Sequence, residues 1–402
     1  MKKVDLLRCM SERKIIIFGT GERGNKFYWK YKDKLHMAYV TSNLDDKTIG
    51  NLERVEWRDF VGNENYLIVV CSQAENEIAY QLLEEGLVYG KDFIDQNLAE
   101  ALLDEKEIVL FVGQCELEVI DYMLNSISEF TRQYVSICYR EYDVLGIKGY
   151  RNPKLEMSLI VNSVSELADY FIYPANLSKE RQDYYQRLLN KLPSGCKSVS
   201  VPLTTFEGYW PQDLDAYYEP SPYYKRDTAD KFPFGGRRDN NLEAAVKEGK
   251  AEETLKDILR DDFYTEEEVC NLFRKSLKKY KVLERKSDIK ICDFIEGNYM
   301  ERKVFLDRGH VCDFVLKEYA KRIVIYLDIS LDVKLIDKAD LDWYNQCHSE
   351  QPIYPSVQKQ LKFCGNEVYR FWFNGGMRYM GREEYFSLLC RYMESVKRGN
   401  SM

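Results

Sequence analysis

Residues 14–24 read Lys-Ile-Ile-Ile-Phe-Gly-Thr-Gly-Glu-Arg-Gly, and residues 108–115 read Ile-Val-Leu-Phe-Val-Gly-Gln-Cys. Each stretch is a short apolar run, rich in β-branched residues, that ends in a glycine turn and leads into a helical pattern. Such runs predict buried strands, and strands that alternate with helices predict parallel sheets. Two starts of this kind in one chain predict an α/β protein with two parallel-sheet domains.

The pattern along the rest of the chain places the domains. We expect a Rossmann-like domain over residues 1–105 and a larger domain over residues 106–402 of the 402-residue chain. Further strands are predicted at residues 37–41, 66–70, 92–94, 135–139 and 169–173. Ser163-x-x-Glu166 has the pattern of a capping box and predicts the start of a short helix. Residues 242–297, with a second capping box at Thr265-x-x-Glu268, are interpreted as a helical insertion or lid.

Composition limits the classes of partner. Lys and Arg number 58 and Asp and Glu number 66, which gives a net charge of −8 with neutral His. This balance argues against nucleic acid or anionic lipid as the main partner, because both require a basic surface. No apolar run approaches the roughly 20 residues of a transmembrane helix, and the N-terminus lacks the apolar core of a signal peptide.

The cysteines and histidines argue against a metal centre or a disulfide framework. The eleven Cys are irregularly spaced and form no Cys-x-x-Cys pair, which fits free thiols in a cytoplasmic protein. The three His, at positions 36, 310 and 348, are far apart in the sequence. We therefore expect no structural zinc.

The first glycine turn has the spacing of a phosphate-binding loop. Gly19, Gly21 and Gly24 follow a predicted strand and precede a predicted helix, whose first amides can donate to a phosphate. A dinucleotide site also needs an acidic residue at the end of the next strand, where this chain has Thr41-Ser42-Asn43. The turn therefore predicts either a nucleotide or phosphate site, or a Rossmann-like module that binds no cofactor.

The second glycine turn carries a cysteine. Cys115 is expected at the start of a helix, where the helix N-terminus stabilises a thiolate and the backbone N–H groups resemble an oxyanion hole. These features make Cys115 a candidate nucleophile. The alternative is a buried, unreactive thiol, as for most cysteines.

A carboxylate and an imidazole are three residues apart near a later helix. In a loop, this spacing lets Asp307 accept a hydrogen bond from one nitrogen of His310 and leaves the other nitrogen to act as a base. The alternative is an ordinary surface loop. A nucleophile after the first strand of a domain and an Asp–His pair before its last large helix is the order found in the SGNH-hydrolase fold.

From about residue 107 onward the chain resembles the WcbI-type polysaccharide biosynthesis family. The family's Gly-Asn-Cys-Gln turn corresponds to Gly113-Gln114-Cys115-Glu116, and its histidine segment corresponds to residues 304–311, with Val311 in place of a proline. Other landmarks are Ala168-Asp169, Val201-Pro202, Gly208-Tyr209-Trp210-Pro211, Phe232-Pro233-Phe234-Gly235 and Pro352-Ile353-Tyr354-Pro355. The resemblance implies an SGNH-like three-layer fold and an acetyltransferase of capsule synthesis that uses coenzyme A or acetyl-coenzyme A.

An acyl-transfer hypothesis gives roles to particular residues. Cys115, His310 and Asp307 would be catalytic, and Gly113, Gln114 and Asn176 would surround the oxyanion. Within the aromatic and proline-rich loop 206–241, we expect contacts with the coenzyme or sugar from Lys225, Arg226, Arg237, Arg238, Tyr209 and Trp210. The basic residues are equally explained as part of a solvated loop.

The expected substrate is a saccharide or nucleotide sugar. Glycan-assembly enzymes are the expected class of protein partner. Two other functions stay open at this point. One is an esterase of the same fold that removes acetyl groups, and the other is a scaffold or sensor without catalysis.

Overall fold

A computed structural model describes residues 2–43, 47–141, 155–175, 178–203, 205–215, 223, 237–341, 344, 348–363, 368–373 and 376–399. The chain divides into two compact units, each of which is described by itself. Unit 1 comprises Met1–Ser200 and Ile323–Ala339, and unit 2 comprises Val201–Arg322 and Asp340–Met402. The predicted domain boundary at residue 105 falls between the two sheets of unit 1. The division into two domains at this residue stays a prediction.

The apolar run at residues 14–18 forms the central strand of the first sheet in unit 1. The strand order is β3-β2-β1-β4-β5, and all neighbouring strands are parallel. The strands are β1 (Lys14–Phe18), β2 (His36–Thr41), β3 (Glu53–Arg54), β4 (Tyr66–Val70) and β5 (Phe93–Asp95). Ile15, Ile16 and Ile17 are all fully buried, which explains the continuous apolar pattern of this strand.

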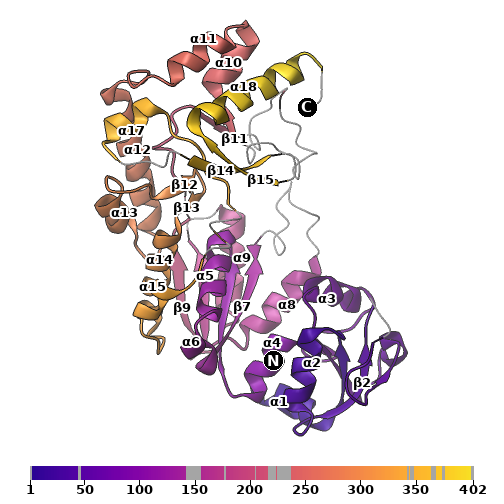
Figure 1. Cartoon of the computed structure of the whole chain (residues 1–402). Coiled ribbons are helices and arrows are strands. Elements are labelled where there is room, and N and C mark those ends of the chain that lie inside the picture. The colour runs from indigo at the N-terminus through magenta and orange to yellow at the C-terminus, as the bar shows by residue number, and fades with distance from the viewer. Residues whose placement is uncertain are drawn as a thin grey trace. The chain divides into compact units, whose positions relative to one another are not determined.

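One helix precedes β1, and others follow strands of this sheet along the chain (Figure 1). They are α1 (Lys3–Glu12), α2 (Glu22–Tyr31), the 3₁₀ helix η1 (Trp57–Phe60), α3 (Glu75–Glu84) and α4 (Gln96–Leu103). α4 begins at Asp95, whose side chain accepts a hydrogen bond from the Leu98 amide. This alternation of strand and helix produces the predicted parallel sheet.

Two glycines make the turn between β1 and α2 very tight. Gly19 has a φ of +132°, and a Cβ atom on Gly24 would lie 1.9 Å from the Gly19 carbonyl oxygen. A Cβ atom on Gly21 would meet no atom within 4 Å. Gly24 is therefore required by backbone packing, whereas Gly21 is not.

Replacing Gly24 with alanine is expected to destabilise unit 1 by roughly 2–3 kcal/mol, because the added methyl group overlaps backbone atoms. Amide hydrogen exchange of the β1 peptide, followed by mass spectrometry, measures this change in unit 1 alone. Gly21→Ala is the matched control and should change the exchange by less than about 1 kcal/mol. Equal exchange rates in the two variants would contradict the packing argument.

The second apolar run forms the second sheet of unit 1. Its order is β7-β6-β8-β9, and β6 pairs in parallel with both β7 and β8. The strands are β6 (Glu107–Gly113), β7 (Tyr134–Arg140), β8 (Tyr170–Pro174) and β9 (Lys197–Val201). The accompanying helices are α5 (Cys115–Asn125), α6 (Ser128–Gln133), α8 (Leu155–Ser165), α9 (Lys179–Leu189) and α15 (Lys334–Lys338). The predicted α/β class with two parallel sheets is confirmed.

One predicted helix start is wrong. Ser163 lies in the last turn of α8, which begins at Leu155 and ends at Ser165. The apolar residues 159–161 continue the helix through the supposed cap. Ser165 is fully buried and its Oγ donates to the Asn162 carbonyl oxygen at 2.8 Å, so serine here supports the end of a helix.

Among its described residues, unit 2 contains helices and three antiparallel pairs of strands. The pairs are β10 (Asp213–Asp215) with β11 (Arg237–Asp239), β12 (Phe305–Asp307) with β13 (His310–Val311), and β14 (Val368–Phe373) with β15 (Gly376–Gly381). The helices are α10 (Asn240–Glu248), α11 (Ala251–Ile258), α12 (Glu266–Glu284), α13 (Cys292–Asn298), α14 (Asp313–Leu327), α17 (Pro355–Leu361) and α18 (Arg382–Lys397). The unit boundary at residues 322 and 323 lies inside α14.

The predicted helical region of residues 242–297 is present as α10 to α13. Thr265 and Glu268 form the predicted capping box, in which each side chain accepts a hydrogen bond from the other residue's amide. α10 and α11 pack against α18, and α12 packs against α17 (Figure 1). A role as a lid stays a prediction. No helix in the described ranges is long and apolar enough to cross a lipid bilayer.

Candidate functional site

Cys115 is the first residue of α5, directly after the buried strand β6 of unit 1. Gln114 is the N-cap, with extended backbone angles, and its carbonyl oxygen accepts the Leu117 amide at 3.0 Å. A Cβ atom on Gly113 would lie 2.5 Å from Leu117 Cδ1, so glycine lets this turn pack closely. The helix N-terminus favours a thiolate at Cys115, whereas the Glu116 carboxylate, 3.6 Å from Sγ, disfavours it.

Asp307 and His310 face each other across the hairpin β12–β13 of unit 2. His310 Nδ1 lies 3.0 Å from both carboxylate oxygens of Asp307, and the Gly309 amide donates to the same carboxylate at 2.7 Å. Asp307 is buried, while about a quarter of the His310 side chain is exposed. Because an acceptor pair faces Nδ1, this nitrogen carries a proton, and Nε2 is the atom that can accept another. The local pairing predicted from the sequence is therefore present.

A second histidine, which the sequence pattern does not connect with the site, lies beside the first. The ring centroids of His310 and His348 are 4.8 Å apart. Burial, followed by the positive charge of His310, lowers the pKa of His348 to about 4, so this imidazole is neutral at pH 7. The two residues are far apart in the chain, and only the scarcity of histidine in this sequence could have drawn attention to the pair.

The structure places Tyr209 and Trp210 in the core of unit 2. Both are almost fully buried. The Tyr209 ring lies 5.2 Å from that of Phe363, and Trp210 Nε1 donates to the Gln351 carbonyl oxygen at 3.3 Å. The expected stacking on adenine or sugar would require these rings to be uncovered, so their observed contacts are those of core residues.

The predicted basic group is only partly described. Arg238 is buried and its guanidinium forms two hydrogen bonds with the Glu243 carboxylate, one of them 2.7 Å long. Arg237 lies in β11, next to it in sequence. Asn176, Lys225 and Arg226 lie outside the described residues. Arg238 is thus neutralised within the fold instead of being held ready for a phosphate.

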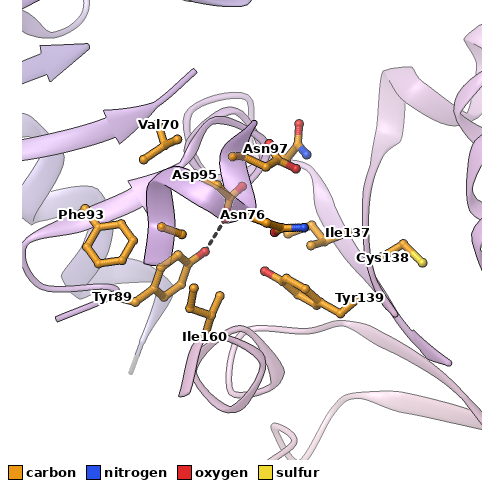
Figure 2. Close-up of a pocket in the computed structure, with 12 residues that line it drawn as sticks. Val70, Asn76, Tyr89, Phe93, Asp95, Asn97, Ile137, Cys138, Tyr139 and Ile160 are labelled. Carbon is orange, nitrogen blue, oxygen red and sulfur yellow. Dashed lines mark hydrogen bonds between the residues drawn. The ribbon is translucent and has the colours of Figure 1, made fainter. Parts of the chain in front are cut away.

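Unit 1 contains a small cavity at the carboxyl ends of β4 and β5, the edge at which α/β sheets usually bind ligands. Its volume is about 50 Å³, and β7 supplies part of its wall (Figure 2). Figure 2 shows the hydroxyl groups of Tyr89 and Tyr139 directed into the same space, with Tyr89 donating to Asp95. Burial and the charge of Asp95 raise the pKa of Glu75, another lining residue, to about 7.

Arg23 connects this cavity with the first glycine turn. Its guanidinium lies 2.9 Å from the Glu75 carboxylate and donates to the Ser72 carbonyl oxygen at 2.8 Å. Arg23, the arginine of this turn, is thus paired with a carboxylate in the wall of the cavity. Carboxylates already line this cavity, so it is unfavourable for a phosphate. Nucleotide binding at Gly19, Gly21 and Gly24 stays a prediction.

Comparisons with known proteins favour one family. Residues 177–332 match the model of the polysaccharide biosynthesis enzyme WcbI. No curated protein matches the chain. A solved structure of WcbI, described as a novel polysaccharide biosynthesis enzyme in its native form without a disulfide bond between coenzyme A and a cysteine, aligns with a TM-score of 0.54. That alignment covers 73% of this chain and 90% of WcbI at 19% identity, which shows a similar fold.

The similarity to WcbI supports the resemblance drawn from the sequence. The matched segment includes Asp307 and His310 but ends before His348, and it begins after Cys115. Within the described residues, no group of three or more His, Cys, Asp or Glu side chains is arranged to hold a metal ion. Of the residues predicted to be catalytic, Cys115 lies in unit 1, and Asp307 and His310 lie in unit 2.

Proposed function

We propose that the protein transfers an acyl group, acetyl in the simplest case, from acyl-coenzyme A to a saccharide hydroxyl in the biosynthesis of a surface polysaccharide. The observation that carries the proposal is the Asp307–His310 pair, with Nδ1 held 3.0 Å from both carboxylate oxygens. This arrangement leaves Nε2 to accept a proton. The similarity to WcbI supplies the pathway class, and coenzyme A is named for WcbI itself.

Two routes are consistent with these groups. In the direct route, His310 Nε2 accepts the proton of the sugar hydroxyl while its oxygen attacks the thioester carbonyl. The thiolate of coenzyme A then leaves and takes up the proton. In the covalent route, His310 would accept the proton of Cys115 while the Cys115 sulfur attacks the thioester, and the departing coenzyme A thiolate would take up that proton, which leaves an acyl-cysteine. In the second step, His310 would accept the proton of the sugar hydroxyl while the sugar oxygen attacks the acyl-cysteine, and the Cys115 thiolate would leave and take up the proton.

The other predicted residues have supporting roles in this scheme. The developing oxyanion is proposed to be held by the backbone N–H of Cys115, together with groups of Gly113, Gln114 and Asn176, and one such donor is worth roughly 3 kcal/mol of the barrier. Lys225, Arg226 and Arg237 are proposed to contact the coenzyme phosphates. Asp307 stabilises the imidazolium form of His310. An SGNH-like arrangement of these groups is part of the proposal.

Incubation with acetyl-coenzyme A is expected to add one acetyl group to Cys115 if the route is covalent, and intact-protein mass spectrometry with peptide mapping measures this. Cys115→Ala should show no adduct. Cys196→Ala is the matched control, because burial raises the pKa of the Cys196 thiol to about 12 and makes it a poor nucleophile. Acetylation that persists in Cys115→Ala but disappears in Cys196→Ala would contradict the assignment.

A thermal-shift measurement separates transferase from esterase. Coenzyme A should raise the melting temperature of a transferase, because it binds the folded state selectively. Acetate release from a model ester without coenzyme A, together with no shift, would instead support an esterase with the same Asp–His pair. A protein that shows neither effect, and no acetyl transfer to any saccharide, would be a scaffold, and the proposal would be wrong.

A further inference from the structure

The ring of His310 packs against an imidazole that the acyl-transfer scheme does not use. The His310 and His348 rings meet at 4.8 Å with an interplanar angle of 60°. His348 is largely buried, whereas His310 is partly exposed. His310 thus lies between the Asp307 carboxylate at Nδ1 and a second ring at its side.

Tyr344 contacts both the strand that carries His310 and the ring of His348. Its hydroxyl donates to the carbonyl oxygen of Val311, the residue that follows His310, at 2.6 Å. Its own carbonyl oxygen lies 3.2 Å from His348 Nδ1, and the two rings are 4.2 Å apart. Tyr344 is almost fully buried. The side chain and the backbone carbonyl of one residue therefore connect the strand that carries His310 to the ring that packs on His310.

The contact with Tyr344 fixes the tautomer of His348. A carbonyl oxygen only accepts, so His348 Nδ1 carries the proton and Nε2 carries the lone pair. The charged groups that bear on His348 are Asp307, His310 and Arg370, and Arg370 is itself held by Glu350 at 2.8 Å. A second positive charge beside a protonated His310 would be repelled at this short distance.

We propose that Tyr344 and His348 form a bracket that fixes the orientation of the His310 ring and confines the transferred proton to His310. This inference rests on the proposed function of His310 as the base. His348 is then a positioning residue, neutral throughout the cycle, whose ring replaces water beside the imidazolium. It makes no bond to the substrate.

The chain's three histidines make a direct test feasible. In protein labelled with ¹⁵N-histidine, His36→Gln, His310→Gln and His348→Phe assign every ring signal. Lowering the pH from 8 to 5 should leave His348 in the Nδ1–H neutral form, since its pKa of about 4 lies below this range. The His310 Nδ1–H proton, bound to Asp307, should be slow to exchange in the wild type.

Two substitutions of His348 distinguish the effect of its planar ring from that of its imidazole nitrogens. His348→Ala should accelerate exchange of the His310 Nδ1–H proton and lower kcat for acyl transfer roughly 10–100-fold with little change in KM, because the base loses its orientation. His348→Phe keeps a planar ring and should restore most of both properties. His36 is exposed at the start of β2 in unit 1, so His36→Gln should leave both unchanged.

The inference is overturned if His348 titrates near pH 6.5, or if His348→Ala leaves the exchange of the His310 proton unchanged in a protein that near-ultraviolet circular dichroism shows to be folded. These two readouts need no substrate. A wild-type protein without acyl transfer, but with the expected proton signals, would overturn the proposed function while the bracket itself stands.

Discussion

Replacing His310 with glutamine is expected to lower kcat for acyl transfer by roughly 10²–10⁴-fold, the usual contribution of a positioned base. Glutamine keeps a polar group of similar length beside Asp307, but it cannot accept a proton and carry it as a cation. The hairpin β12–β13 should remain intact, because its register depends on backbone pairing and on Phe305, whose ring stacks on Phe206 at 4.4 Å. Steady-state kinetics with acetyl-coenzyme A and a saccharide acceptor measure the effect.

Asp307→Asn is the companion variant for this prediction. Its amide still accepts through one oxygen but loses the charge that stabilises the imidazolium, so kcat should fall without loss of the fold. His36→Gln serves as the control for loss of an unrelated histidine. Full activity in His310→Gln would remove the base assignment and with it the proposed mechanism.

Replacing Trp210 with alanine is expected to lower the free energy of unfolding of unit 2 by roughly 3–5 kcal/mol. The ring is 2% exposed, and its Nε1 donates to the Gln351 carbonyl oxygen, so its removal leaves a cavity and a buried acceptor without its donor. Urea unfolding followed by hydrogen exchange of peptides from unit 2 measures the loss.

Trp29→Ala is the matched control, since this tryptophan is 58% exposed on α2 and should contribute less than about 1 kcal/mol. If Trp210 is only a core residue, Trp210→Ala should bind coenzyme A with unchanged affinity at a temperature where it is folded. A large loss of affinity with unchanged stability would instead support the stacking role expected from the sequence.

The central strands β1 and β6 were predictable because nearly all of their residues are buried. Ile15, Ile16 and Ile17 are all at 0% exposure, and so are Ile108 to Val112, so an uninterrupted apolar run leaves little choice of structure. The pairing of Asp307 with His310 was also predictable, because three residues of separation suffice to bring the two side chains together. Neither inference needs knowledge of distant contacts.

Most of the remaining features depend on residues beyond the local pattern. Tyr209 lies in an aromatic, proline-rich stretch that has the composition of a binding surface, yet Phe206, Phe273 and Phe363 bury it. His348 acquires its role only where the fold brings it to His310. Ser163 has the local pattern of a helix start inside a helix that began eight residues earlier. For Tyr209, tertiary packing overrides a local signal.

The return of residues 323–339 to unit 1 has a consequence for synthesis of the protein on the ribosome. The Ser330 amide donates to the hydroxyl of Tyr134, and Lys197 Nζ donates to the Leu327 carbonyl oxygen at 3.1 Å. Both sheets have therefore been translated long before the segment that completes their unit emerges. While most of unit 2 is synthesised, the surface of unit 1 that contacts residues 323–339 must stay uncovered. A fragment that ends at Ser200 would lack the partners of Tyr134 and Lys197.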